Sequence, residues 1–199
     1  MGILTTANEL HYWNYFLVLE ADVDYLAKYV EICSDNYQTY SIEILRLITS
    51  FVGEVETLLK LLEKRHSQKC KNIHEHIKFL QKYCAGISEF VVKIPRFSIE
   101  SLTPWQVINQ EYDFDKKTPS WWDVNNQIKH RRHTNYQNAN LFRLLESMAA
   151  LYACNIFYYR DQALSGSLLP SPKLCRPTQK NYNGNTMNEF EIGINYTNL

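Results

Sequence analysis

One long stretch of the chain alternates apolar and polar residues with the period of an α-helix. Between about Ser41 and His66, apolar side chains recur every three or four residues, the spacing of a single helix face. They cover roughly 200° of the helix circumference, more than the ~100° of a surface helix. The centre of this face is formed by Ile44, Leu47, Ile48, Phe51, Val52, Val55, Leu58, Leu59 and Leu62. We therefore expect a central helix with neighbours on two sides.

Three charged residues of this helix, Glu54, Glu56 and Lys60, lie outside the centre of its apolar face. Glu56 and Lys60 have the i,i+4 spacing of a helix salt bridge, which is the expected role for this pair. Glu54 falls at the edge of the apolar face, so we expect its carboxylate to be partly buried.

Weaker helical patterns surround the central helix and predict an all-α fold. Helices are expected from a capping box at Thr6-Ala7-Asn8-Glu9 to about Cys33, from about Asn72 to Val91, from Thr118-Pro119 to about Arg132, and from about Ala139 to beyond Ile156. We predict a bundle of four to five helices in residues 1–164. An irregular connection is expected around Pro95 and Pro104, continuing to Lys117. Residues 165–199 are expected to form an irregular tail, in which residues 190–196 alternate like one short strand.

Composition limits the partners of this fold. Twenty-one basic and twenty-one acidic residues give a formal net charge of zero, so any nucleic-acid site must be a local patch. No apolar run approaches the ~18 residues of a membrane span, and no membrane partner is expected. The five cysteines form no Cys-x-x-Cys pair, which favours reduced thiols in a cytoplasmic protein without a structural zinc site. His74 and His76 are two residues apart and would point to different sides of a helix. No metal or other cofactor is expected.

The segment from Trp121 to His133 is the most chemically dense part of the chain. Residues three and four apart share a helix face, so a continuous helix would place Asn126 beside His130, with Lys129 and His133 next to them. A histidine can transfer a proton near neutral pH, and a neighbouring cation can hold a phosphate. These groups are those that metal-independent RNA cleavage by the 2′-hydroxyl requires.

A structural interpretation of the same segment is also open. The run Lys129-His130-Arg131-Arg132 has the charge that suits the solvated carboxyl end of a helix, where the macrodipole is negative. In this interpretation Trp121 and Trp122 are core anchors and not platforms for base stacking.

Several short motifs resemble the HEPN superfamily of small all-α bacterial and archaeal domains over about residues 12–159. They are Tyr40-Ser41-Ile42-Glu43, Glu54-x-Glu56-x-x-x-Lys60, Pro119-Ser120-Trp121-Trp122, Asn126-x-x-Lys129-His130-x-Arg132 and Ala139-Asn140-Leu141. The resemblance implies a helical bundle that dimerises and belongs to phage-defence or toxin–antitoxin systems. Many such proteins are metal-independent ribonucleases whose paired sites meet across the dimer. Their signature is an arginine followed four to six residues later by a histidine. Here His130 precedes Arg132, and members that lack the signature act as non-catalytic modules.

Two hypotheses follow. In the first, the chain is an RNA-directed homodimeric domain and a metal-independent ribonuclease. His130, Arg132, Asn126 and Glu54 would be its catalytic group, and Lys129, Arg131 and His133 would contact RNA. In the second, the chain is a non-catalytic helical module that dimerises or binds a partner protein.

Overall fold

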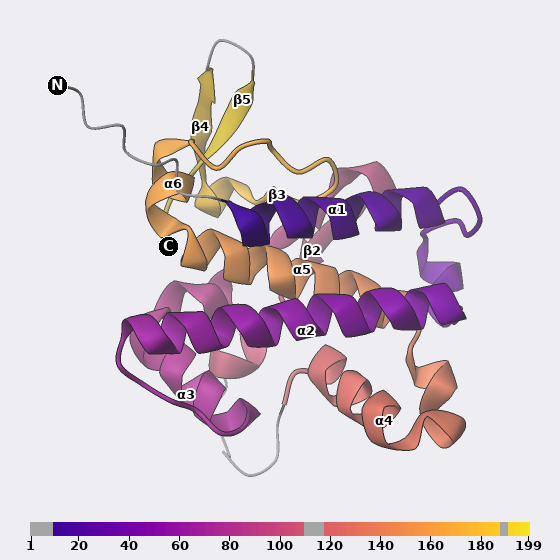
Figure 1. Ribbon diagram of the computed structural model, residues 1–199. Coiled ribbons are helices and arrows are strands. Elements are labelled where there is room, and N and C mark those ends of the chain that lie inside the picture. The colour runs from indigo at the N-terminus through magenta and orange to yellow at the C-terminus, as the bar shows by residue number, and fades with distance from the viewer. Residues whose placement is uncertain (1–9, 110–117, 188–190) are drawn as a thin grey trace, which may run out of the picture.

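The fold is built around three long helices. The computed structural model describes residues 10–109, 118–187 and 191–199. Helices α1 (His11–Leu26), α2 (Ile42–Arg65) and α5 (Leu141–Tyr158) pack against one another, with α5 seen between α1 and α2 in Figure 1. Helix α4 (Ser120–Asn135) packs on both α2 and α5, while α3 (Ile73–Tyr83) follows α2 after a turn and α6 (Arg160–Ser165) continues from α5. No helix in this part of the chain is long and apolar enough to cross a membrane.

Polar side chains cap the amino-terminal ends of the two central helices. Ser41 Oγ accepts a hydrogen bond from the Ile44 amide at 3.1 Å, and the Asn140 side chain accepts one from the Arg143 amide at 3.1 Å. Every residue at the predicted centre of the α2 apolar face is buried. The expected central helix is therefore confirmed, and α5, which is buried on nearly all sides, packs along it.

The expected all-α bundle with an irregular tail is wrong. The described residues contain six α-helices together with two antiparallel sheets. One sheet has the strand order β2 (Ile99–Leu102), β1 (Val92–Ile94), β3 (Arg176–Pro177), and the other is the hairpin of β4 (Tyr182–Met187) and β5 (Ile192–Tyr196). Strands of two to four residues are too short for a periodic signal. The pairing of β1 with β3 also joins segments far apart in the sequence.

The C-terminal segment packs tightly against the helices. The Glu20 carboxylate on α1 accepts hydrogen bonds from the amides of Lys173, Leu174 and Cys175 at 2.7, 2.9 and 2.8 Å. Burial raises the pKa of Glu20 despite these bonds. The Tyr152 hydroxyl of α5 lies 2.7 Å from that of Tyr196 on β5. Residues after α6 thus complete the same hydrophobic core.

Several helix ends differ from the prediction. Helix α1 ends at Leu26 and α3 at Tyr83, where Cys84 leaves the helical conformation at φ −136° and ψ 45°. The predicted capping box at Thr6-Ala7-Asn8-Glu9 lies outside the described residues. Short 3-10 helices fill the connections: η1 (Ser34–Asn36), η2 (Ala85–Glu89), η3 (Pro95–Phe97), η4 (Gln106–Asn109), η5 (Tyr136–Asn138) and η6 (Gln179–Asn181). The later part of the predicted third helix, after Tyr83, instead forms η2 and the short connection to β1.

Candidate functional site

The first turns of α4 are anchored in the core. Trp121 is 1% exposed, and its indole Nε1 donates a hydrogen bond to the Pro104 carbonyl at 3.0 Å. The ring of Trp105 meets that of Trp121 edge-on, with centroids 5.1 Å apart. Trp122 is also buried. The two adjacent tryptophans are therefore core anchors, as the structural interpretation of this segment expected.

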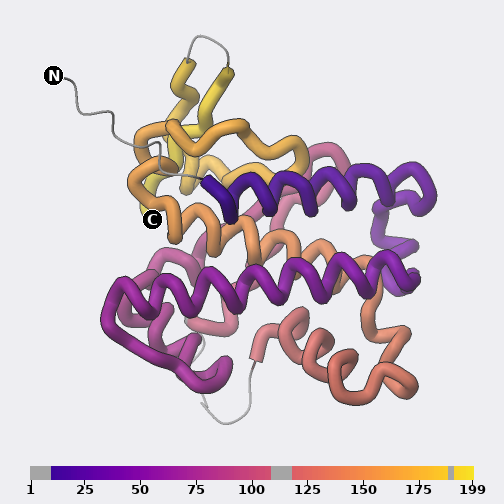
Figure 2. The backbone as a smooth tube through the Cα atoms, in the orientation of Figure 1, coloured from indigo at the N-terminus to yellow at the C-terminus, as the bar shows by residue number. Residues whose placement is uncertain are grey.

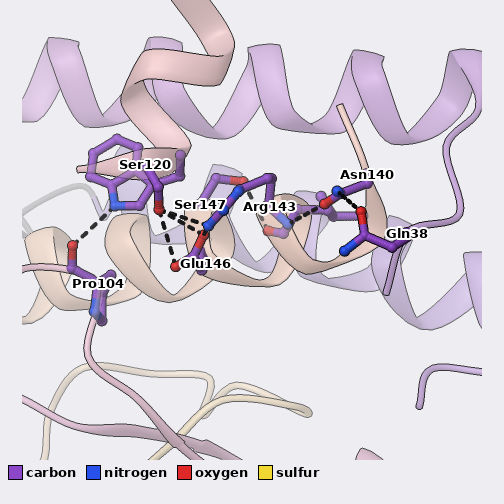
Figure 3. A network of polar contacts seen from close by, with 9 residues as sticks. Gln38, Pro104, Ser120, Asn140, Arg143, Glu146 and Ser147 are labelled. Atoms are coloured by element: carbon purple, nitrogen blue, oxygen red, sulfur yellow. Dashed lines mark hydrogen bonds and ion pairs between the residues drawn. The ribbon is translucent and has the colours of Figure 1, made fainter. Parts of the chain in front are cut away.

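A polar network joins the start of α4 to α5 (Figure 3). Arg143 Nη1 donates to Ser120 Oγ at 2.8 Å and forms an ion pair with Glu146, while Ser120 Oγ donates to Glu146 at 3.1 Å. The capping residue Asn140 also donates to the Gln38 side chain at 2.9 Å. Side chains from the loop before α2, from α4 and from α5 thus fix one another. This network ties the start of α4 to α5.

Helix α4 bends at Arg131, whose φ of −143° and ψ of 51° are not helical. The carbonyl of Arg131 accepts hydrogen bonds from Thr134 Oγ1 at 3.2 Å and Asn135 Nδ2 at 3.0 Å. Asn126 and His130 lie on the regular part of the helix, one turn apart. The expected alignment of His133 with them does not extend across the bend, because the regular helical advance is interrupted there.

We call residues Lys129–His133 the α4 elbow. All five side chains are exposed. In the part of the chain that the structure describes, the side chains of His130, Arg131, Arg132 and His133 form no hydrogen bond or ion pair. Their polar groups are therefore directed to solvent. The elbow lies at the lower right of Figure 2, after the straight part of α4.

A carboxylate of α2 interacts electrostatically with Lys129, the first residue of the elbow. Glu56 forms the predicted ion pair with Lys60, at 2.6 Å between Oε1 and Nζ. The hydrogen bond from Lys60 lowers the pKa of Glu56, and the positive charge of Lys129 lowers it further. Glu56, which was expected only to form a surface pair, is thus electrostatically linked to α4.

The elbow residues that follow the bend lie beside an apolar groove. Arg132 and His133 line this groove together with Ile42, Leu45 and Tyr136. Ile42 is 79% exposed. The ring of Tyr136 meets that of Tyr40 edge-on, with centroids 5.3 Å apart, and Tyr40 is itself exposed. Cationic and aromatic groups therefore occur together on this surface, an arrangement that the linear sequence did not predict.

Two residues of the predicted catalytic group make no described hydrogen bond or ion pair with the exposed cations. Glu54 is half-buried, as expected, and burial raises its pKa. No hydrogen bond or ion pair connects Glu54 with the elbow among the described residues. Asn126 is half-buried, and its side chain makes no described hydrogen bond to His130. The structure thus brings Lys129, His130, Arg131, Arg132 and His133 together as an exposed run, without a polar partner that orients the imidazole.

A second concave region lies at the opposite end of α2. This cavity of about 840 Å³ is lined by cationic and aromatic side chains, among them Arg65, His66, Tyr83, Tyr158 and Arg160. Its two arginines are engaged by the protein: Arg65 donates to the Tyr158 carbonyl at 2.7 Å and Arg160 to that of Leu199 at 2.6 Å. Its arginines are less available to a ligand than the cations of the elbow.

A buried polar cluster also escaped the sequence interpretation. Glu63, Cys70 and His76 converge between α2, the turn after it and α3. His76 was considered only beside His74, whereas its structural partner lies on another helix. The sequence did contain a signal for the burial of Glu63. Glu63 follows Leu45 by about five helical turns, so both side chains point to the same, buried side of α2.

In comparisons with known proteins, the chain matches no protein-family model, no curated protein and no solved structure.

Proposed function

We propose that this chain is an RNA-directed domain that binds the phosphate backbone of RNA at the α4 elbow. The observation that carries the proposal is the exposed run Lys129–His133, whose side chains project from a bend in a firmly anchored helix. Lysine and arginine are the usual phosphate contacts in nucleic-acid complexes. Because the whole chain has no net charge, this local concentration of cations is the relevant electrostatic feature.

The groove beside the elbow favours single-stranded RNA. Unpaired bases stack on aromatic side chains, while adjacent cations follow the backbone. Tyr40 and Tyr136 lie next to each other at the groove that Arg132 and His133 line. A duplex would offer phosphates but no unstacked base to these rings. We therefore expect single-stranded RNA to bind more tightly than a duplex of equal length.

The geometry supports binding more directly than cleavage. A general acid or base must be held within hydrogen-bonding reach of the group it serves. His130 is exposed, and no described side chain fixes its tautomer. Cleavage, as the HEPN resemblance implies, would need RNA itself or a second copy of the chain to complete the site.

The binding proposal can be tested with fluorescence anisotropy of a labelled single-stranded RNA over a series of KCl concentrations. Each phosphate contact contributes about −0.7 to the slope of log K against log salt. Arg132→Ala is expected to weaken binding by about 3- to 10-fold and to make the slope less steep by about 0.7. Lys64→Ala removes an exposed lysine of α2 and is the matched control, with affinity unchanged. Equal affinities for the two variants would refute the proposed interface.

Cleavage is tested by incubating the purified chain with total RNA and tRNA in EDTA, beside His130→Ala. If His130 is the acid or base, its loss should reduce cleavage by about 10²- to 10⁴-fold while the fold persists. If neither protein cleaves RNA but both bind it, the domain is a non-catalytic RNA-binding module.

One observation favours the alternative of a dimerisation or partner-binding module. Helix α1 and the turn that follows it expose Val18, Tyr25 and Tyr29, which are 58%, 54% and 70% exposed. Adjacent exposed apolar and aromatic side chains are common at protein interfaces. Sedimentation velocity of the wild type and Val18→Asp distinguishes the two functions. A dimer that this substitution dissociates, together with no RNA binding at any salt concentration, would support the alternative.

A further inference from the structure

Three side chains with metal-ligating groups meet in the interior beside α3. Glu63 lies near the end of α2, Cys70 in the turn that follows it, and His76 in the first half of α3. A carboxylate oxygen of Glu63, the Cys70 Sγ and a ring nitrogen of His76 all lie within 4.8 Å of one another. Glu63 and His76 are only 2% and 4% exposed, and Cys70 is half-buried.

The local fold holds each of the three in place. The Cys70 amide donates a hydrogen bond to Glu63 Oε2 at 3.0 Å, so the turn after α2 closes over the carboxylate. Asn72 caps α3 by accepting the Glu75 amide at 3.0 Å, which orients the turn that carries His76. His76 Nδ1 faces Glu63 Oε1 at very short range, and the Trp122 ring lies 6.3 Å from the imidazole centroid.

We propose that Glu63, Cys70 and His76 form a binding site for a divalent zinc-like cation. Thiolate, imidazole and carboxylate are the three ligand types that zinc accepts, whereas magnesium and calcium prefer oxygen alone. Tetrahedral bonds of about 2.0 to 2.3 Å place ligand atoms roughly 3.5 Å apart. Small side-chain adjustments would bring the three ligand atoms to that spacing, with Glu63 and His76 moving slightly apart and the Cys70 thiol approaching them. Binding replaces the thiol proton of Cys70, which is released to solvent.

The surroundings of the site indicate a structural role for the cation. Its ligands are enclosed by α2, α3 and the core tryptophan Trp122 of α4. A cation there would link the α2–α3 turn to the base of the helix that carries the elbow. Three protein ligands leave a fourth position for water or for another protein group. This site is independent of RNA binding, because no elbow residue belongs to it.

Cobalt(II) titration of the full chain, after treatment with EDTA and dialysis, tests the proposal directly. We expect one equivalent of Co²⁺ to produce the intense near-ultraviolet charge-transfer band of a cobalt–thiolate bond. Cys70→Ser should abolish this band. Cys33→Ser is the matched control, because Cys33 is also a half-buried free thiol but lies outside the cluster, and it should retain the band.

Thermal unfolding gives a second readout that does not depend on a cysteine variant. Zn²⁺ at about one hundred times its Kd should raise the Tm by roughly 5 to 10 °C, and Mg²⁺ should leave it unchanged. His76→Gln should remove the zinc-dependent shift. A wild-type chain that shows neither the thiolate band nor a zinc-dependent Tm, or a band that survives Cys70→Ser, would overturn the proposal and leave a hydrogen-bonded cluster alone.

Discussion

The α4 elbow and the Glu63–Cys70–His76 cluster are opposite kinds of polar region. The elbow is dense in the sequence, with five ionisable residues in a row, yet its side chains are exposed and make no described hydrogen bond or ion pair. The cluster is spread over fourteen positions, yet its ligating atoms lie within 4.8 Å of one another. Closeness along the chain therefore does not establish a chemical site. Convergence of side chains from different elements does.

The difference determines what each region can do. Exposed cations keep their hydration and can exchange it for phosphate, so the elbow suits a reversible electrostatic contact. Buried polar groups need partners, because an unpaired one costs about 1 to 3 kcal/mol. The cluster is therefore expected to affect stability, and the elbow only binding.

The largest expected effect concerns RNA affinity. Reversing three elbow charges with Lys129→Glu, Arg131→Glu and Arg132→Glu should weaken RNA binding by at least about 100-fold, because each cation then repels a phosphate. The free energy of unfolding should change by no more than about 0.5 kcal/mol, since all three side chains are exposed. Anisotropy titration and urea unfolding measure the two quantities.

A control for this variant keeps the total change of charge. Lys28→Glu, Lys64→Glu and Lys69→Glu alter three exposed lysines away from the elbow. If this control loses as much affinity as the elbow variant, RNA is attracted by overall charge and not by the elbow.

The next largest effect is on stability and concerns the buried cluster. Glu63→Ala leaves the Cys70 amide and the buried His76 without their acceptor. We expect a loss of about 2 to 3 kcal/mol in the free energy of unfolding, measured by urea denaturation in the presence of a chelator. Arg132→Ala should change stability by less than about 0.5 kcal/mol in the same assay. Similar losses for both variants would remove the distinction between the two regions.

The smallest effects separate two neighbouring glutamates on α2. Burial raises the pKa of Glu54, so its charged form is disfavoured in the folded state at neutral pH. Glu54→Gln should therefore stabilise the protein by up to about 0.5 kcal/mol at pH 7. This gain should disappear as the pH falls below the usual range of a glutamate, where the wild-type side chain is protonated in both states.

Glu56 should behave in the opposite way. The hydrogen bond from Lys60 lowers the pKa of Glu56, so its carboxylate stabilises the folded state above the pKa of the unfolded chain. Glu56→Gln should destabilise by about 0.3 to 0.5 kcal/mol at pH 7, the size of an i,i+4 pair, and this loss should vanish as the pH falls through the folded-state pKa. Stability curves for both variants from pH 3 to pH 8 check the two signs, and effects of the same sign would contradict the assigned environments.

A helix could be predicted more clearly when its periodic pattern of apolar residues extended over more turns. α2 gave a clear signal because its apolar face extends over about five turns, and Ser41 and His66 bound it as observed. The predicted end of α4 at about Arg132 lies beside the bend at Arg131, but the continuation of α4 to Asn135 was not predicted. Strand β1 escaped prediction because it has three residues and pairs with Pro177, far along the chain.

The candidate site was predicted in part for similar reasons. A run of charged residues is visible without any structure, so the elbow residues were identified. The groove beside the elbow was not predicted, because Tyr40 and Ile42 lie at the start of α2, far from Tyr136 in the sequence, and reach it only after folding. The link between Glu20 and the amides of residues 173–175 is another contact that no local pattern encodes.

The sequence alone determined the helical framework, the zero net charge and the position of the cationic run, because periodicity and composition are local properties that a linear pattern contains. Only the tertiary structure decided that the elbow faces solvent, that the C-terminal segment completes the core, and that Glu63, Cys70 and His76 meet. Those outcomes depend on which distant surfaces pack together, and the free energy of packing is a property of the whole chain and not of any one segment.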